Sequence, residues 1–310
     1  MSGNWVKIAA PATTSNIGPG FDTFGLAMSE PFDIIEGRKI DSGLKILEVT
    51  GHGSENIPLD PKINSVSIAA EQVLKRCNAD FGIELKIKKG IRPCSGMGSS
   101  GASAAGGAFL ANILCGEKLS STELILCAAH AEDVTSGGFH ADNVSPCILG
   151  GFTVIRSYQP FEVIKIEPPK DLGMVVVLPN VMIATIDARK VLPREVSLRD
   201  MVFHIGNAST MVYGMTTGDL KWIGKSVNDA VIEPARTKLV PSLKEAKKEA
   251  QTHGALASFL GGSGPCIMSF FDMRHVNGDI IAEKVKAIYT ENGINCDTWV
   301  TKPGVGCKRI

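Results

Sequence analysis

A glycine- and serine-rich run, PCSGMGSSGAS, lies between a predicted strand and a predicted helix at residues 93–103. The strand is indicated by alternation, since Ile83, Leu85 and Ile87 would face one way and the charged residues between them the other. Glycines allow a backbone to approach a ligand closely, and the free N–H groups of a first helical turn attract anions. The run therefore predicts a loop that binds phosphate oxygens, with a flexible turn before a tightly packed helix as the alternative.

The spacing of three glycines in this run, Gly96, Gly98 and Gly101, also matches the dinucleotide-binding fingerprint. A Rossmann unit needs a second strand after the helix, but Ser120 and Glu123 form a capping box that predicts another helix there. A Walker loop is not indicated, because no lysine follows the glycines. If the loop binds ATP, positive charge must come from Mg²⁺ or from elsewhere in the chain.

A second motif, PATTSNIGPGFD at residues 11–22, follows a short predicted strand. It carries one amide, Asn16, and one carboxylate, Asp22, which would suit an amine or a hydroxyl of a small substrate. Taken alone, the same residues could be ordinary turn chemistry and a cap.

A third cluster begins at Glu132, near the end of the capped helix, and continues in the segment SGGFHADN at residues 136–143. Glu132, His140 and Asp142 could supply a Mg²⁺ ligand, a hydrogen-bonding ring and a base. The alternative is a solvated helix residue followed by loop groups that are satisfied locally. A zinc site is less well supported, since no second histidine or cysteine stands at ligand spacing.

Two further features carry groups that could bind a substrate. The sequence LGGSGP at residues 260–265 separates two predicted strands, and it is either an ordinary connection or a backbone surface for phosphate or substrate. Arg189 and Arg236 could each bind a carboxylate through a two-pronged hydrogen bond, although an arginine is more often a surface charge.

The composition disfavours several classes of protein. The chain has 32 basic and 32 acidic side chains among 310 residues, so neither a nucleic acid nor an anionic membrane is expected as a partner. No run of 18 apolar residues occurs, and residues 1–8 contain no signal-like apolar segment. The eight cysteines include no C-x-x-C pair and lie mostly in apolar or glycine-rich runs, which favours reduced thiols and a cytoplasmic location. A small-molecule function is therefore expected.

The order of predicted elements indicates two domains. The segment between them contains three prolines, Pro160, Pro168 and Pro169. We therefore expect domains at residues 1–167 and 168–310. Beyond this boundary, with inserted helices set aside, the predicted order is β-α-β-β-α-β, which is the ferredoxin-like arrangement.

Together, the motifs at residues 11–22, 93–103 and 261–265 resemble the three signature motifs of the GHMP kinases in order and spacing. The resemblance covers nearly the whole chain. It implies an α+β fold with an N-terminal ATP-binding domain like ribosomal protein S5 and a ferredoxin-like C-terminal domain. Within the family, the motifs at residues 16–22 and 140–146 resemble the members that phosphorylate the side-chain hydroxyl of L-homoserine for threonine synthesis.

The resemblance also implies roles for the candidate residues. ATP would be bound by Pro93, Cys94, Ser95, Gly96, Met97, Gly98, Ser99, Ser100, Gly101, Ala102 and Ser103, with Mg²⁺ on Ser100 and Glu132. The amino-acid substrate would be bound by Asn16, Asp22, His140, Asp142, Asn143, Arg189, Arg236 and Gly262, with both arginines on its carboxylate. Asp142 and Asn143 are the candidate catalytic residues, with Asn143 nearest the reacting hydroxyl. Members of the family often form homodimers, so a homodimer is expected.

The role of Asp142 stays open at this point. It stands roughly where mevalonate kinases have an aspartate base, but phosphoryl transfer depends mainly on alignment and charge neutralisation, so we expect Asp142 to position the substrate. Two other functions also stay open: a kinase of the same fold that acts on another hydroxy acid or a polyol phosphate, and a binding protein on a decayed kinase fold. The presence of Ser100, Glu132 and Asp142 together argues against decay.

Overall fold

The computed structural model describes residues 4–310, with positions 136 and 185 described by their backbone only. Residues 1–3 of the segment expected to lack a signal lie outside the described residues. In chain order, the first part contains β1 (Val6–Asn16), β2 (Gly20–Ile40), β3 (Leu44–Gly51), the 3₁₀ turn η1 (Ser54–Asn56), α1 (Ser65–Arg76), β4 (Gly82–Lys89), α2 (Ser99–Leu114), α3 (Ser121–Ser136), α4 (Val144–Leu149), β5 (Phe152–Tyr158) and β6 (Phe161–Ile166). The remainder contains β7 (Leu172–Pro179), α5 (Thr185–Lys190), α6 (Leu198–Thr217), α7 (Leu220–Ser226), α8 (Ile232–Arg236), the 3₁₀ turn η2 (Thr237–Leu239), α9 (Leu243–Thr252), β8 (Ala257–Leu260), β9 (Ile267–Asp272), α10 (Gly278–Glu291), β10 (Cys296–Thr301) and β11 (Lys308–Arg309).

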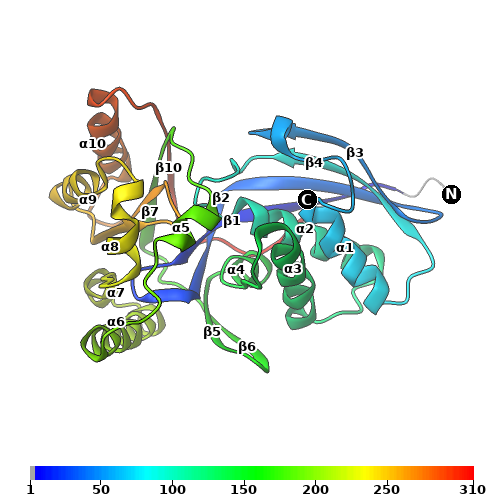
Figure 1. Cartoon of the computed structure of the whole chain (residues 1–310), viewed down its shortest axis with the longest axis horizontal. Coiled ribbons are helices and arrows are strands. Elements are labelled where there is room, and N and C mark those ends of the chain that lie inside the picture. Colours follow the sequence, from blue (N-terminus) through cyan, green and yellow to red (C-terminus); the bar gives the residue numbers. More distant parts are fainter. Residues whose placement is uncertain (1–3) are drawn as a thin grey trace.

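The first sheet has the strand order β11-β1-β2-β4-β3, with β5 beside β2 and β6 beside β5. Figure 1 shows α1 to α4 gathered below these long strands. At the centre, α2 contacts α1, α3 and β1, and its small residues make this close packing possible. A Cβ atom added at Gly107 would lie 2.1 Å from the carbonyl oxygen of Val66, and one added at Gly106 would lie 2.4 Å from Ile35. The glycines after the phosphate-loop motif therefore serve helix packing, whereas those within it serve the loop.

The second sheet has the antiparallel strand order β10-β7-β9-β8, with α9 and α10 at the far left end of the molecule in Figure 1. This order and connectivity confirm the predicted ferredoxin-like arrangement. Strand β7 is buried along its whole length. Met174 and Val176 pack into a core shared with the first sheet, while Val175 and Val177 pack into a second core beneath α9 and α10. The first of these two cores contains residues from both parts of the chain, so the two parts pack directly against each other.

The end of the chain returns to the first sheet. Strand β11 pairs with β1, and Met28 forms a bridge with Pro303. The division into residues 1–167 and 168–310 stays a proposal, with residues 302–310 lying against the first part. All eight cysteines are free, and none of the helices in residues 4–310 is long and apolar enough to cross a membrane.

Candidate active site

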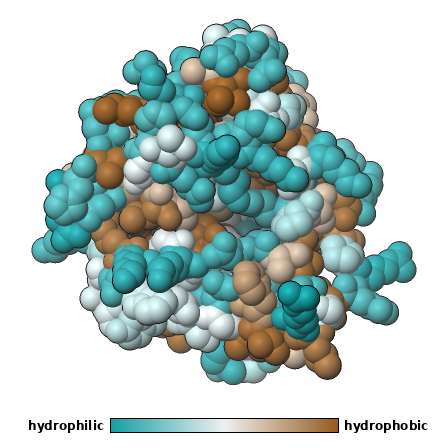
Figure 2. Space-filling view, turned by 90° about the vertical axis from the view of Figure 1, so that its left-hand side faces the viewer, coloured by the Kyte–Doolittle hydropathy of each residue, from teal (hydrophilic) through white to brown (hydrophobic). Residues whose placement is uncertain are grey.

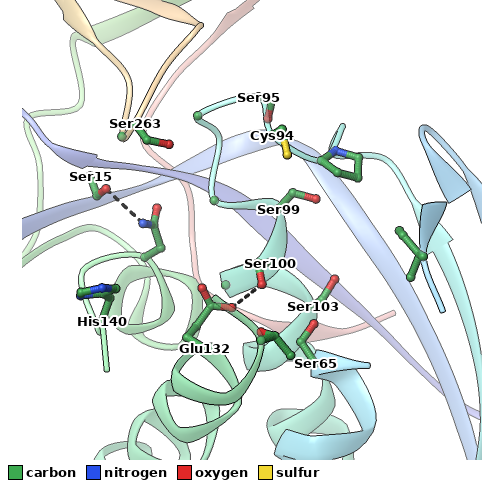
Figure 3. A pocket seen from close by; sticks show the side chains of 18 of the residues that line it. Ser15, Ser65, Cys94, Ser95, Ser99, Ser100, Ser103, Glu132, His140 and Ser263 are labelled. Carbon is green, nitrogen blue, oxygen red and sulfur yellow. Dashed lines mark hydrogen bonds between the residues drawn. The ribbon is translucent and has the colours of Figure 1, made fainter. Parts of the chain in front are cut away.

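A cavity of about 440 Å³ lies where the three glycine motifs meet. Its wall contains every predicted site residue except Met97 and Ala102, whose side chains are buried in the core. Figure 3 shows the serines of the loop and of the α2 start on one side, Glu132 below them, and Ser15, Ser263 and His140 on the other side. The cavity thus brings together residues that are up to 248 positions apart in the chain, from Ser15 to Ser263.

The glycine loop is held in place by backbone bonds to its two neighbouring motifs. Met97 accepts a hydrogen bond from the Thr13 N–H at 3.1 Å, and Ser95 accepts one from the Cys266 N–H at 3.2 Å. Gly98 has a φ of +65° and begins α2 as an N-cap without a side-chain bond. Because no side chain of the described residues caps this helix start, its first N–H groups are available to an anion in the cavity.

A buried ion pair lies directly under this helix start. Lys89 pairs with Asp33, and its Nζ also donates to Ser103 Oγ at 2.7 Å and to the Ser99 carbonyl at 3.2 Å. Burial raises the pKa of Asp33, while Lys89 acts against that shift. Lys89 lines the cavity, so a lysine does lie beside the glycine loop, although it comes before the glycines in the sequence and not after them. The alternation of β4 indicates this position: Lys89 lies an even number of residues after Ile83, so it is on the same, buried face of the strand.

Glu132 and Ser100 form an oxygen pair at the floor of the cavity. Ser100 Oγ donates to Glu132 Oε1 at 2.5 Å. Burial raises the pKa of Glu132 to about 7, with Ser100 acting in the opposite direction. The carboxylate is therefore desolvated without a full counter-charge, and hard oxygen donors of this kind suit Mg²⁺. No group of three or more His, Cys, Asp or Glu side chains fit to hold a metal occurs within residues 4–310, so other ligands would have to come from phosphate and water.

The side chains of Asp142 and Asn143 lie at the other end of the cavity. Thr13 Oγ1 donates to Asn143 Oδ1 at 2.8 Å, and Asn143 Nδ2 donates to Ser15 Oγ at 3.0 Å. Asp142 is 4% exposed. Burial, aided by the charge of Asp22, raises the pKa of Asp142 to about 6. Thr13 and Ser15 were within a predicted motif, but nothing in the sequence distinguished them from their neighbours.

The two predicted arginines converge on the same end. Arg189 Nη2 donates to Asp22 Oδ1 at 2.7 Å and lies 3.3 Å from His140 Nδ1. Arg236 is buried and donates to the carbonyl oxygen of Gly262 at 2.9 Å. Burial lowers the pKa of Arg236, and the nearby charge of Arg189 lowers it further. Two guanidinium groups held this close favour an anionic ligand such as a carboxylate.

Asn16 and Phe21 fix the surroundings of these arginines. Asn16 donates to the Gly262 carbonyl at 2.9 Å and accepts from the backbone N–H of Asp22 at 3.1 Å. The guanidinium carbons of Arg189 and Arg236 lie 5.3 Å and 5.6 Å from the centre of the Phe21 ring. Burial and the Arg189 charge lower the pKa of His140, which keeps this ring neutral at pH 7. The pocket therefore offers carboxylate acceptors and guanidinium donors side by side.

An apolar wall closes the cavity beyond the glycine loop. It was not predicted, because its residues come from a loop, a helix and a strand without a common motif. Its members are Ile57, Pro58, Ile63, Val66 and Ile87. A planar, weakly polar group such as a nucleotide base fits against side chains of this kind.

Known proteins match this chain along its length. The model of the GHMP kinases N terminal domain matches residues 64–151, and that of the GHMP kinases C terminal region matches residues 211–291. A homoserine kinase from Methanococcus maripaludis is 40% identical over 305 residues, which are 97% of each chain. A homoserine kinase from Pyrococcus horikoshii is 41% identical over 310 residues, 98% of this chain and 99% of the relative.

Solved structures give the same result. The crystal structure of homoserine kinase from Cytophaga hutchinsonii superposes with a TM-score of 0.94 at 35% identity, covering 99% of this chain and 97% of the other. Mevalonate kinase from L. major, at 18% identity and a TM-score of 0.70, covers 96% of each chain and shares the fold.

Proposed function

The chain belongs to the homoserine kinases of the GHMP kinase family, and on this premise we propose that it transfers the γ-phosphoryl group of ATP to the side-chain hydroxyl of L-homoserine. The product, O-phospho-L-homoserine, serves threonine synthesis. One observation carries the proposal: a single cavity joins an uncapped helix start to a pocket of two arginines and two aspartates.

ATP occupies the half of the cavity nearer α2. Its phosphates lie against the first turn of α2, where the helix dipole and the N–H groups favour negative charge. Its base lies against the apolar wall. Mg²⁺ would be held by Ser100 and Glu132 and would neutralise charge between the β- and γ-phosphates.

The amino acid occupies the other half. Its carboxylate binds Arg189 and Arg236, and its ammonium group binds Asp22 and Asp142, which lie within the same pocket. This arrangement leaves the side-chain hydroxyl next to Asn143 and facing the glycine loop. The acceptor oxygen then bonds to the γ-phosphorus as the bond to the β,γ-bridging oxygen breaks. ADP leaves with that electron pair, and the hydroxyl proton passes to solvent.

ADP release with Mg-ATP tests this function on a panel of acceptors: L-homoserine, L-serine, L-threonine, mevalonate, galactose and shikimate. We expect strong turnover with L-homoserine alone. Turnover on another acceptor would keep the kinase but contradict the assignment of the two arginines. Intact ATP binding without any turnover would favour a binding protein.

A homodimer and a cytoplasmic location belong to the same proposal. Helix α6 exposes apolar side chains at i, i+3, i+4 and i+7: Leu198, Met201, Val202 and Ile205, of which Leu198 is 77% exposed. Figure 2 views the end of the molecule that carries α6 and α7, and brown side chains gather in its lower part. An exposed apolar patch of this kind could pack against the same patch of a second copy of the chain. Light scattering should give twice the chain mass of 32.9 kDa, and a Val202→Lys variant should give the monomer mass.

A further inference from the structure

The carboxamide of Asn143 is one link in a directed series of hydrogen bonds. Thr13 donates to Asn143 Oδ1 at 2.8 Å, and Asn143 Nδ2 donates to Ser15 Oγ at 3.0 Å. The dashed line from Ser15 in Figure 3 marks the second bond. Asn143 Nδ2 also lies 3.4 Å from Asp142 Oδ1. The N–H side of the amide therefore faces the buried Asp142 carboxylate, and its oxygen faces Thr13.

Turning the Asn143 amide by 180°, so that its oxygen and nitrogen exchange places, would cost free energy. If the Asn143 amide turned over, its oxygen would face the Asp142 carboxylate, and two acceptors would oppose each other in a buried site. Ser15 would also have to change from acceptor to donor in its bond with the amide. Leaving a buried acceptor without a donor costs about 1–3 kcal/mol. Thr13 is fully buried, so its hydroxyl hydrogen is best used on Asn143 Oδ1.

The orientation of the amide matters because of where its oxygen points. A Cβ atom added at Gly98 would lie 2.8 Å from Asn143 Oδ1 and 2.0 Å from Thr13 Oγ1. Gly98 is the N-cap of α2, where the phosphates bind in the proposed function. The amide oxygen therefore faces the loop, and one of its two lone pairs is used by Thr13.

We propose that Thr13 is a positioning residue, which holds Asn143 Oδ1 toward the phosphate loop so that this oxygen accepts a hydrogen bond from the acceptor hydroxyl. That bond turns a lone pair of the hydroxyl oxygen toward the γ-phosphorus. Thr13 itself touches neither substrate nor nucleotide and takes no proton. The inference rests on the proposed function, because it concerns the hydroxyl that this function phosphorylates.

The test compares Thr13→Val, which keeps the shape but removes the donor, with Thr13→Ser, which keeps the donor. Thr13→Val should lower kcat about 10-fold and change KM for L-homoserine and for ATP less than about 2-fold, since alignment is lost while binding is kept. Thr13→Ser should restore kcat to within about 3-fold of the wild type. Thr14→Val is the matched control: Thr14 is also fully buried, but its hydroxyl has no hydrogen-bond partner among the described residues. Its kcat should be unchanged.

A double-mutant cycle with Asn143→Ala completes the test. If Thr13 acts through Asn143, Thr13→Val should change kcat less than about 2-fold once Asn143 is alanine. An unchanged kcat in Thr13→Val, or the same 10-fold loss in the Asn143→Ala background, would overturn the inference. Thermal unfolding checks that each variant is folded, and Thr13→Ala replaces Thr13→Val if valine prevents folding. Absence of wild-type turnover would instead count against the proposed function, before any variant is compared.

Discussion

The ammonium group of Lys89 lies beneath the first turn of α2, paired with the Asp33 carboxylate at a position where both side chains are buried. Asp33 is held in turn by the backbone N–H groups of Gly90 and Ile91, at 2.9 and 3.0 Å. The pair therefore joins β2, the end of β4 and the start of α2 into one unit under the proposed phosphate site. Because the charges of Lys89 and Asp33 cancel, the partial positive charge at this place is that of the helix end itself.

Replacing Lys89 by methionine should destabilise the protein by about 3–5 kcal/mol, because Asp33 would remain buried without its cation. Urea unfolding at pH 7 measures this loss. In Asp33→Asn/Lys89→Met both charges are gone, and we expect much of the stability to return. Equal losses in the single and the double variant would show that the pairing of the charges is not what matters.

Asp142 should give the acceptor a pH dependence. Burial raises its pKa to about 6, so the Asp142 carboxylate becomes protonated as the pH falls through about 6. The pocket then has one negative charge fewer to bind the ammonium group of the substrate. We expect kcat/KM for L-homoserine to fall below that pH, because this ratio reports groups of the free enzyme. The measurement is a kcat/KM profile for L-homoserine from pH 5 to 8. Glu132, whose pKa is about 7, lies in the same cavity and affects both proteins, so in the Asp142→Asn control only the inflection near pH 6 should disappear.

The same Asp142→Asn variant separates positioning from base catalysis. If Asp142 binds the ammonium group, the substitution should chiefly raise KM for L-homoserine and lower kcat less than about 10-fold. Steady-state kinetics at pH 8 decide between the two roles. A fall in kcat of about 100-fold or more is typical of a lost general base and would contradict our assignment.

Arg189 should recognise the carboxylate of the acceptor. Arg189→Met should raise KM for L-homoserine about 10- to 100-fold, the range expected for one charge-assisted hydrogen-bonding group, and leave KM for ATP unchanged. The control substrate is 3-aminopropan-1-ol, which is homoserine without its carboxylate. Wild type should discriminate strongly against it and Arg189→Met weakly. The same ratio of kcat/KM values in both proteins would remove Arg189 from carboxylate binding.

Gly98 should tolerate no side chain. Gly98→Ala places a Cβ atom 2.0 Å from Thr13 Oγ1 at a φ of +65°, so the start of α2 must move. Nucleotide affinity, measured by titration calorimetry, should fall about 10-fold or more, because the N–H groups of the first turn no longer point toward the phosphates. Gly116 has a φ of +82° and open space around it, so Gly116→Ala shares the backbone strain without the collision. Similar affinities in the two variants would rule out the collision as the cause.

Much of the fold could be predicted from local patterns. The capping box at Ser120 begins α3 as expected, and the β-α-β-β-α-β order appears in the second sheet. Both follow from signals that act within a few residues, such as cap hydrogen bonds and side-chain periodicity. The glycine loop was recognised for the same reason, since its conformation requires glycine at specific positions such as Gly98.

Long-range pairings could not be predicted in this way. Thr13 and Asn143 are 130 positions apart, and Lys89 and Asp33 are 56 apart, so no sequence window contains either pair. Strand β11, near the C-terminus, pairs with β1, near the N-terminus, so the two strands of this pair are also far apart in the sequence. The apolar wall of the cavity likewise exists only after three separate segments have folded together.

The most direct test of the account is phosphorus NMR of a reaction containing the protein, Mg-ATP and L-homoserine. We predict a new phosphomonoester resonance that grows in step with ADP, together with a proton spectrum that places the ester on the side-chain oxygen. ADP accompanied only by inorganic phosphate, or an ATP spectrum that does not change, would contradict the claim that this cavity aligns the hydroxyl of L-homoserine with the γ-phosphorus of ATP.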